Sequence, residues 1–329
     1  MLQYLVILLD DTSVAYCHAD NPLKKRNLMP IDTLRKAILF GMKENLMIQY
    51  VLPEYELPEE YYVVMETIDN VKIGRDVAVY NDVPKSIVAE NVVLRLSISE
   101  FVAQQYDIAA LFPQVTRLNI CLKDIETFKD EQQEDYKKAL ATLNAVLLNL
   151  YKSGKQPQLN ILTDRLLLKE MHNCGAGDNN ITLAPNGKFY LCPAFYYDER
   201  MGINNRLNHH KPQHDYSVGD LDAGLQIPNQ QLLRLDHAPL CRICDAYHCK
   251  RCVWLNQRLT WDSNTPSHQQ CVLAHLERNA SRELQMMLFE APEDGCVANT
   301  ADEPSASQVI PNEIKEITYL DPFDVREEF

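Results

Sequence analysis

The sequence predicts an α/β protein, in which a parallel sheet covered by helices is followed by a cysteine-rich region and an acidic tail. Short apolar runs alternate with amphipathic segments through residues 1–170, and seven of the ten cysteines lie between Cys174 and Cys271. Residues 290–329 hold 11 acidic and 2 basic residues. Alternating βα units with right-handed crossovers give either a doubly wound sheet or a partial barrel. We expect three parts, residues 1–170, 171–289 and 290–329.

Six segments are predicted to be strands because they are short, apolar and rich in β-branched residues. The first, residues 3–9 (QYLVILL), is the continuous apolar run typical of a strand buried on both faces. The later strands are expected at residues 47–52, 71–80, 91–96, 115–122 and 158–162.

Helices are predicted where apolar residues recur at a spacing of three or four. Residues 29–45 show this spacing, and Pro30 suits a first helical turn. Ser97 or Ser99 can cap the helix that follows the fourth strand. The remaining helices are expected at residues 58–68, 131–152 and 271–289.

A β-hairpin is the strongest local signal in the chain. Residues 181–185 and 188–192 can both form strands, and Asn186-Gly187 joins them. This pair is preferred in type I′ turns, so we predict a hairpin with that turn.

Composition excludes several classes of protein. No apolar run approaches the roughly 18–20 residues of a membrane span, and the N-terminus lacks the basic start of a secretory signal. The net charge of −14 disfavours binding to nucleic acid. We therefore expect a cytoplasmic protein with reduced cysteines and no membrane or nucleic-acid partner. Neither GxGxxG nor GxxxxGK[ST] occurs, and we name no catalytic or cofactor-binding residue.

The cysteine spacing predicts a metal-binding region. Two CxxC pairs stand close together, and such turns direct two sulfurs at one ion or cluster. A loop-rich segment buries little apolar surface, so a bound metal would supply folding free energy. The alternative, that these are small buried hydrophobic residues, explains the spacing less well. The predicted ligands are Cys174, Cys192, Cys241, Cys244, Cys249, Cys252 and Cys271.

This cysteine order resembles the SPASM domain, which follows the barrel in radical S-adenosylmethionine (radical SAM) enzymes that mature peptides. The family's run is Cx2Cx5Cx3C, and its last two gaps are each one residue shorter here. The resemblance implies two auxiliary [4Fe–4S] clusters, with zinc in the same positions as the alternative. The first cluster would take Cys174, Cys192 and Cys252, and the second Cys241, Cys244, Cys249 and Cys271. The fourth position of the first cluster would be open or filled by a group such as His172 or Asp178.

Residues 1–170 resemble the partial (β/α)6 barrel of radical SAM enzymes, in a degenerate form. That family places Cx3Cx2C in the loop after the first strand, where three thiolates hold the cluster that cleaves S-adenosylmethionine. The loop here reads DDTSVAYCHADNP, with Cys17 alone, and VLPEYELP stands where a GGE-like segment is expected. We expect no functional S-adenosylmethionine cluster.

The segments YLVILLDDTS, KENLMIQYVLPEYELPEEY and CRICDAYHCKRCVWLN are similar to the CXXX-repeat peptide maturase family of Bacteroidales. The resemblance implies maturation of a ribosomally synthesised precursor peptide (RiPP) with cysteine repeats, together with a partner modification protein. The barrel mouth or an exposed sheet edge would take the peptide by strand addition. The alternative function is a non-catalytic scaffold that binds the precursor and the modification enzyme, with structural zinc or clusters. A zinc-ribbon-like module on an unrelated α/β domain is a third interpretation.

Roles are also predicted for four further residues. Cys17 is interpreted as a packing cysteine, with a nucleophile or a relic metal ligand as the alternatives. Asp10 and Asp11 could be acid–base groups, but we interpret them as the solvated end of the first strand. His248 is expected to contact a metal-bound sulfur.

Overall fold

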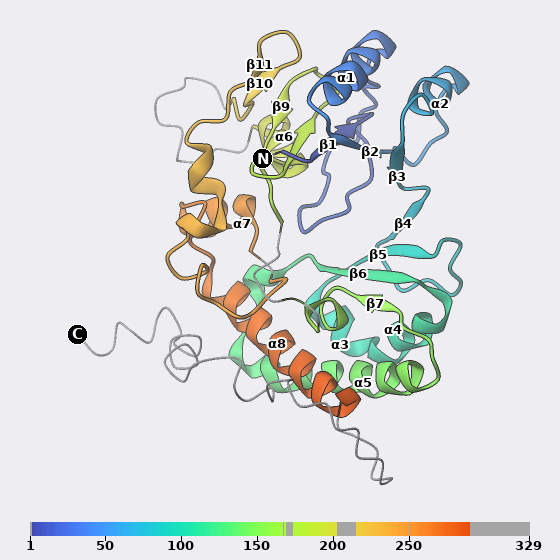
Figure 1. Cartoon of the computed structure of the whole chain (residues 1–329), viewed down its shortest axis with the longest axis vertical. Helices are drawn as coiled ribbons and strands as arrows, with labels where there is room; N and C mark the ends of the chain where they lie inside the picture. Colours follow the sequence, from blue (N-terminus) through green and yellow to red (C-terminus); the bar gives the residue numbers. More distant parts are fainter. Residues whose placement is uncertain (1, 167, 169–173, 203–214, 250, 290–329) are drawn as a thin grey trace, which may run out of the picture.

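A nine-stranded sheet organises the chain, in the order β7-β6-β5-β4-β3-β2-β1-β8-β9 (Figure 1). The computed structural model describes residues 2–166, 168, 174–202, 215–249 and 251–289. Neighbouring strands from β7 to β8 pair in parallel, and β9 pairs antiparallel with β8. The strands are β1 (Tyr4–Leu8), β2 (Met47–Val51), β3 (Asn70–Ile73), β4 (Val77–Tyr80), β5 (Asn91–Leu96), β6 (Arg117–Leu122), β7 (Gln158–Leu159), β8 (Asn180–Leu183) and β9 (Phe189–Tyr190). The sheet curves into a partial barrel, which confirms the predicted α/β class.

Helices cover the convex side of this sheet, with α1 and α2 near one end and α3, α4 and α5 near the other (Figure 1). The helix α8 lies against α5, and Asn144 of α5 donates to the carbonyl oxygen of Ala280 (2.7 Å). Among the described residues, no helix is both long and apolar enough to cross a membrane. The helices are α1 (Ile31–Lys43), α2 (Glu59–Met65), α3 (Ile98–Ala103), α4 (Gln105–Leu111), α5 (Gln133–Lys152), α6 (Pro193–Met201), α7 (Val253–Thr260) and α8 (His268–Phe289).

The expected strand at residues 71–80 is two strands. Gly74, with a φ of 101°, ends β3, and the backbone N–H of Lys72 donates to Asp76 (2.8 Å) to form a turn. β3 pairs with β2, and β4 pairs with β5. The turn therefore divides the predicted strand into two short strands, which pair with different neighbouring strands of the sheet.

The predicted hairpin is confirmed as β8 and β9, but the type I′ turn is wrong. A type I′ turn needs positive φ at both of its central residues, here Asn186 and Gly187. Gly187 has a φ of 77°, whereas Asn186 is not among the residues with positive φ. The N–H of Gly187 donates to Ala184 (2.9 Å), which closes a turn with Pro185 and Asn186 at its centre. Because β8 pairs with β1, this hairpin belongs to the main sheet.

Loops cover both outer strands of the sheet. At β7, the outward N–H of Leu159 donates to Thr163 Oγ1 (2.6 Å), and its carbonyl oxygen accepts from Leu162 (3.1 Å). At β9, the carbonyl oxygen of Phe189 accepts from Val218 (2.7 Å). The expectation of an exposed sheet edge is therefore wrong at these two strands, because their outward groups are already hydrogen-bonded.

Ser97 caps α3. Its Oγ accepts from the N–H of Glu100 (3.2 Å), and the Glu100 carboxylate accepts from the N–H of Ser97 (2.7 Å). We expect Ser97→Ala to lower the free energy of unfolding by about 1 kcal/mol. Ser99→Ala is the matched control, and we expect it to cost less than about 0.5 kcal/mol. Urea denaturation measures both variants, and equal losses would contradict the assignment of Ser97 as the cap.

Candidate functional site

The loop after β1 is fixed against the carboxyl ends of two other strands. Arg95 of β5 is buried, and its guanidinium donates to the carbonyl oxygens of Cys17 (2.9 Å) and Ala19 (3.1 Å). The same guanidinium pairs with Asp20 (2.6 Å). His18 donates through Nδ1 to the carbonyl oxygen of Leu122, the last residue of β6 (2.7 Å). The backbone of Cys17 is therefore held at its own carbonyl oxygen and through the two residues that follow it.

Three of the predicted ligands lie near this loop. Cys192 is the N-cap residue of α6 and Cys252 is the N-cap residue of α7, so each thiol stands at the positive end of a helix dipole. Burial raises the pKa of Cys192 well above its usual value, and the nearby Cys252, Cys17 and Cys174 thiolates raise it further. The first turns of these two helices, at Ala194 and Trp254, line the same cavity as His18 and Ala19 of this loop. We call Cys174, Cys192 and Cys252 the first cysteine set.

The second cysteine set is Cys241, Cys244 and Cys249, with Cys271 expected beside them. Burial raises the pKa of Cys241 to about 12 and that of Cys244 to about 11, and the Cys249 thiolate adds to both shifts. Cys244 Sγ accepts from the N–H of Ala246 (3.4 Å). Such N–H···S contacts stabilise a thiolate, which is the form that binds metal.

Sequence reasoning missed a histidine beside the second set. His275 Nε2 lies 3.7 Å from Cys244 Sγ. His275 follows Cys271 by four residues on α8, so the two side chains share one face of the helix. That placement brings Cys271 to the side of α8 that faces Cys244. His248 Nε2 lies 3.9 Å from Asp164 Oδ2, and its expected contact with a metal-bound sulfur stays a prediction.

Ion pairs fasten the second set to α8. Asp245, adjacent to Cys244, is buried and pairs with Arg278 (2.6 Å) and with Arg282. The guanidinium of Arg251 lowers the pKa of both Cys174 and Cys241. Arg251 is itself buried, so one cation serves both cysteine sets.

Within the described residues, no three His, Cys, Asp or Glu side chains converge closely enough to hold a metal ion. None of the nine described cysteines forms a disulfide. The donor set is nevertheless chemically suited to a soft metal centre, because thiols with charge-stabilising neighbours stand in two groups. The metal role of the seven cysteines and the domain boundaries remain predictions. His172 and the acidic tail lie outside the described residues.

Asp10 and Asp11 are not the solvated end of a strand. Both are buried, and Asp10 accepts from the N–H of Asn27 (2.9 Å) and from the hydroxyl of Tyr55 (3.0 Å). Asp11 accepts from the hydroxyl of Tyr196 and pairs with Arg200 (3.2 Å). The two carboxylates therefore tie α6, the loop before α1 and the loop after β2 to the end of β1, which is a structural role.

A cavity of about 270 Å³ lies beside Cys17, and we call it the α6–α7 pocket. His18 and Leu122 form one wall, and Ala194, Tyr197 and Trp254 form the other. Trp254 donates to Asp198 (2.7 Å), which fixes α7 to α6. The pocket opens at the carboxyl end of β6, the end of the strands where partial and closed (β/α) barrels place their sites.

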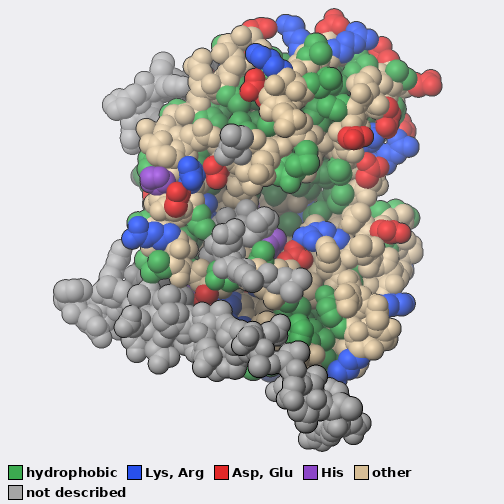
Figure 2. Space-filling view, in the orientation of Figure 1, with side chains coloured by type: hydrophobic (Ala, Val, Ile, Leu, Met, Phe, Trp, Pro, Cys, Tyr) green, Lys and Arg blue, Asp and Glu red, His purple; other side chains and the backbone are tan. Residues whose placement is uncertain are grey.

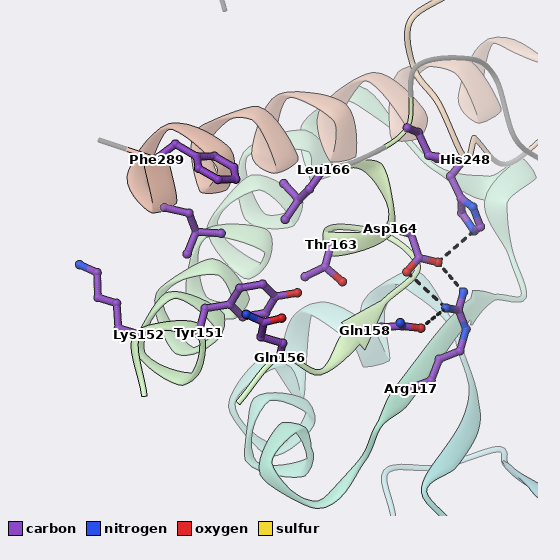
Figure 3. Close-up of a pocket in the computed structure, with 12 residues that line it drawn as sticks. Arg117, Tyr151, Lys152, Gln156, Gln158, Thr163, Asp164, Leu166, His248 and Phe289 are labelled. Atoms are coloured by element: carbon purple, nitrogen blue, oxygen red, sulfur yellow. Dashed lines mark hydrogen bonds and ion pairs between the residues drawn. The ribbon is translucent and has the colours of Figure 1, made fainter. Parts of the chain in front are cut away.

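A second cavity, of about 740 Å³, lies beside β7 (Figure 3). Its polar end holds Asp164 between Arg117 and His248, and Arg117 also donates to Gln158 (2.7 Å). Its apolar wall is made by Tyr151, Leu166, Leu288 and Phe289. The Asp164 carboxylate is already paired with Arg117, so this cavity offers little free charge to a ligand.

Comparison with known proteins identifies the fold. The chain matches no family of known sequences and none of the curated proteins. It is similar in structure to native anSMEcpe, an anaerobic sulfatase-maturating radical SAM enzyme, in the form with bound AdoMet and Cp18Cys peptide. The TM-score is 0.57 and the sequence identity is 12%, and the match covers 87% of this chain and 98% of that chain. The hexahistidine-tagged form of anSMEcpe with bound AdoMet gives a TM-score of 0.57 and 13% identity over the same shares. Native anSMEcpe with bound AdoMet and Kp18Cys peptide gives a TM-score of 0.56 and 13% identity, and the match covers 86% of this chain and 98% of that chain. The chain therefore has a radical SAM-type barrel fold.

Proposed function

We propose that this protein takes part in the maturation of a ribosomally synthesised peptide with cysteine repeats, and that its two cysteine sets hold [4Fe–4S] clusters. The observation that carries the proposal is the pair of thiol groups beside the barrel, on a fold shared with a peptide-bound radical SAM enzyme. Iron–sulfur clusters are held by cysteine thiolates, and here Cys192 and Cys252 each begin a helix whose dipole stabilises the anionic form. Bound clusters would supply electron transfer at these positions.

The peptide is placed inside the partial barrel, because loops cover both sheet edges. Figure 2 shows hydrophobic side chains along a hollow between the part that carries α1 and α2 and the part that carries α3–α5. The α6–α7 pocket is large enough for one or two side chains of such a peptide. Tyr197 and Trp254 give it an aromatic wall, which suits the apolar face of an extended segment.

The alternative function is a non-catalytic scaffold that binds the precursor and a modification enzyme. One observation favours it: Cys17 is alone in the loop where three thiolates would hold the cluster that cleaves S-adenosylmethionine. Incubation with S-adenosylmethionine and a reductant distinguishes the hypotheses about radical chemistry. We expect no 5′-deoxyadenosine, and its formation would overturn the proposal that the barrel is degenerate.

Metal analysis tests the proposed function directly. We expect anaerobically purified protein to contain about eight irons and a matching amount of sulfide per chain, with broad visible absorption. About two zinc ions without colour would support the scaffold with structural metal. A synthetic cysteine-repeat peptide should bind, and the same peptide with serine at each cysteine is the matched control. A chain without metal that binds neither peptide would contradict the proposal.

A further inference from the structure

We infer that the precursor peptide binds as an added strand at an internal edge of the sheet, beside β4. The inference rests on the proposed function, since it takes the cysteine-repeat peptide as the ligand and gives it one position along the hollow of Figure 2. Strand addition needs backbone N–H and C=O groups that have no partner, on a strand that is already held in place. The edge of β4 that faces away from β5 has both properties.

The sheet is interrupted between β3 and β4. β3 pairs with β2 at four positions and β4 pairs with β5 at four, but β3 and β4 pair with each other only at Ile73 and Val77. In the described part of this sheet, every other pair of neighbouring strands is joined at two or more positions. Beyond Val77, β4 therefore has one neighbouring strand, which is β5.

The backbone of Val79 faces this interruption. The carbonyl oxygen of Val77 accepts from the N–H of Gly74 (2.8 Å), so Val77 directs its backbone groups away from β5. Successive residues of a strand direct these groups to opposite edges, so Val79 points the same way as Val77. Ala78 and Tyr80 then pair with β5. Within the described residues, neither the N–H nor the C=O group of Val79 has a hydrogen-bond partner.

β3 offers no comparable edge. The carbonyl oxygen of Ile73 accepts from Leu52 on the β2 side (3.0 Å), so the preceding residue, Lys72, directs its backbone groups toward β4. Both of these groups are occupied by the turn. The N–H of Lys72 donates to Asp76 Oδ2 (2.8 Å), and its carbonyl oxygen accepts from the N–H of Asp76 (2.8 Å). A peptide in the interruption would therefore pair with β4.

β4 is held at both ends, so it has little order to gain when a peptide binds. The hydrogen bond from Gly74 to Val77 fixes its start. Asn81 directly follows its last residue, and the Asn81 side chain accepts from Arg95 of β5 (2.9 Å). A strand edge that is formed in advance costs a ligand less free energy than one that must order on binding.

The two outer strands of the sheet are protected, whereas β4 is not. Loops already bond the outward groups of β7 and β9, through Leu162, Thr163 and Val218. Proteins cover free edges in this way because an open edge pairs with other chains. The β4 edge lies between the part that carries α1 and α2 and the part that carries α3–α5, where Figure 2 shows the apolar hollow. An extended peptide suits this edge, since its backbone supplies both an acceptor and a donor.

Pairing with β4 would give the cysteine repeat a defined orientation. Side chains of a strand alternate between its two faces. In a CXXX repeat the cysteines are four residues apart, so an added strand directs all of them to the same face of the sheet. A shift of the peptide by one repeat restores the same backbone contacts, so successive repeats can occupy the same position beside β4.

N-methylated peptides test this pairing without any change to the protein. Two versions of the synthetic cysteine-repeat peptide carry N-methyl groups at alternate residues, one at the cysteines and every second residue from them, the other at the remaining residues. We expect one version to bind the metal-loaded protein about tenfold more weakly than the unmethylated peptide, because only alternate N–H groups of an added strand face β4. The other should keep its affinity within about threefold. Equal affinities of the two versions would overturn the inference.

Val79→Pro tests the same edge from the side of the protein. Proline removes the outward N–H, and an edge strand tolerates it because this N–H does not belong to the ladder with β5. We expect the affinity for the unmethylated peptide to fall about tenfold. Val88→Pro is the control, since Val88 lies in the loop between β4 and β5 and is 87% exposed, and it should leave the affinity unchanged. An equal effect of both substitutions would overturn the inference.

Hydrogen–deuterium exchange of the wild-type protein separates this inference from the proposed function. We expect the amide of Val79 to exchange faster than those of Ala78 and Tyr80 in the free protein, and to become protected when the peptide binds. A bound peptide that leaves Val79 unprotected would overturn the inference and leave the proposed function intact. A peptide that does not bind the metal-loaded protein would overturn both.

Discussion

Replacing Arg165 with methionine is expected to lower the free energy of unfolding by about 3–5 kcal/mol, because it leaves a buried carboxylate without its partner. Glu277 of α8 is 0% exposed, and its two oxygens accept from Arg165 (2.8 Å) and from the hydroxyl of Tyr136 on α5 (2.7 Å). Arg165 is itself buried, so the carboxylate that it pairs with lies away from solvent. The variant therefore keeps the desolvation cost of the buried Glu277 carboxylate and loses the ion pair with Arg165 that offsets it.

The same substitution should disturb the second cysteine set. Arg165 donates to the carbonyl oxygens of Tyr247 (2.6 Å) and His248 (2.9 Å), immediately before Cys249. Without these bonds the loop has fewer restraints, so we expect metal loss from the second set as well as lower stability. Urea denaturation and metal analysis of the same preparations measure the two effects.

Two variants serve as controls for Arg165. Arg35→Met removes an exposed pair with Asp32 on α1, and we expect a loss of less than about 1 kcal/mol. Arg165→Met combined with Glu277→Met removes both charges, and it should recover part of the stability lost in the single variant. A single variant as stable as the wild type would show that the carboxylate is solvated or protonated in the folded chain.

Strands and helices whose cause is local were predictable from the sequence. β1 follows from an uninterrupted apolar run, and α5 from a leucine stripe at helical spacing. Predictions failed where one residue changes the geometry. Gly74 divides an expected strand, and the turn is centred on Pro185-Asn186, where proline is favoured at the first central position, and not on Asn186-Gly187.

The buried charges were beyond sequence reasoning, because their partners lie far away along the chain. Arg165 is 112 residues from Glu277, and Arg95 is 78 residues from Cys17. Nothing in the spacing marks such pairs. One signal was available: Arg95 interrupts the apolar strand NVVLRL, and a cation inside a buried strand needs acceptors from another segment.

Arg95→Met is expected to lower the free energy of unfolding by about 3 kcal/mol, because buried carbonyl groups lose a charged donor. The guanidinium serves Cys17, Ala19 and Asp20 in one loop, and also Asn81 (2.9 Å). Asp20 is largely exposed and returns to water in the variant, so the main cost falls on the carbonyl oxygens. This loss of stability is smaller than that expected for Arg165→Met, which leaves the buried Glu277 carboxylate without an ion-pair partner.

The effect of Arg95→Met on metal content is expected to be confined to one centre. The loop that it holds shares a cavity with the first turns of α6 and α7, which follow Cys192 and Cys252, whereas Cys241 and Cys244 are fixed through Asp245 and α8. We expect hydrogen–deuterium exchange to increase across residues 12–20 and about half of the metal to be lost. Arg117→Met, in the second cavity beside β7, is the matched control and should keep its full metal content. Equal metal loss in both variants would mean that general destabilisation, and not the position of the Cys17 loop, governs loading of the first centre.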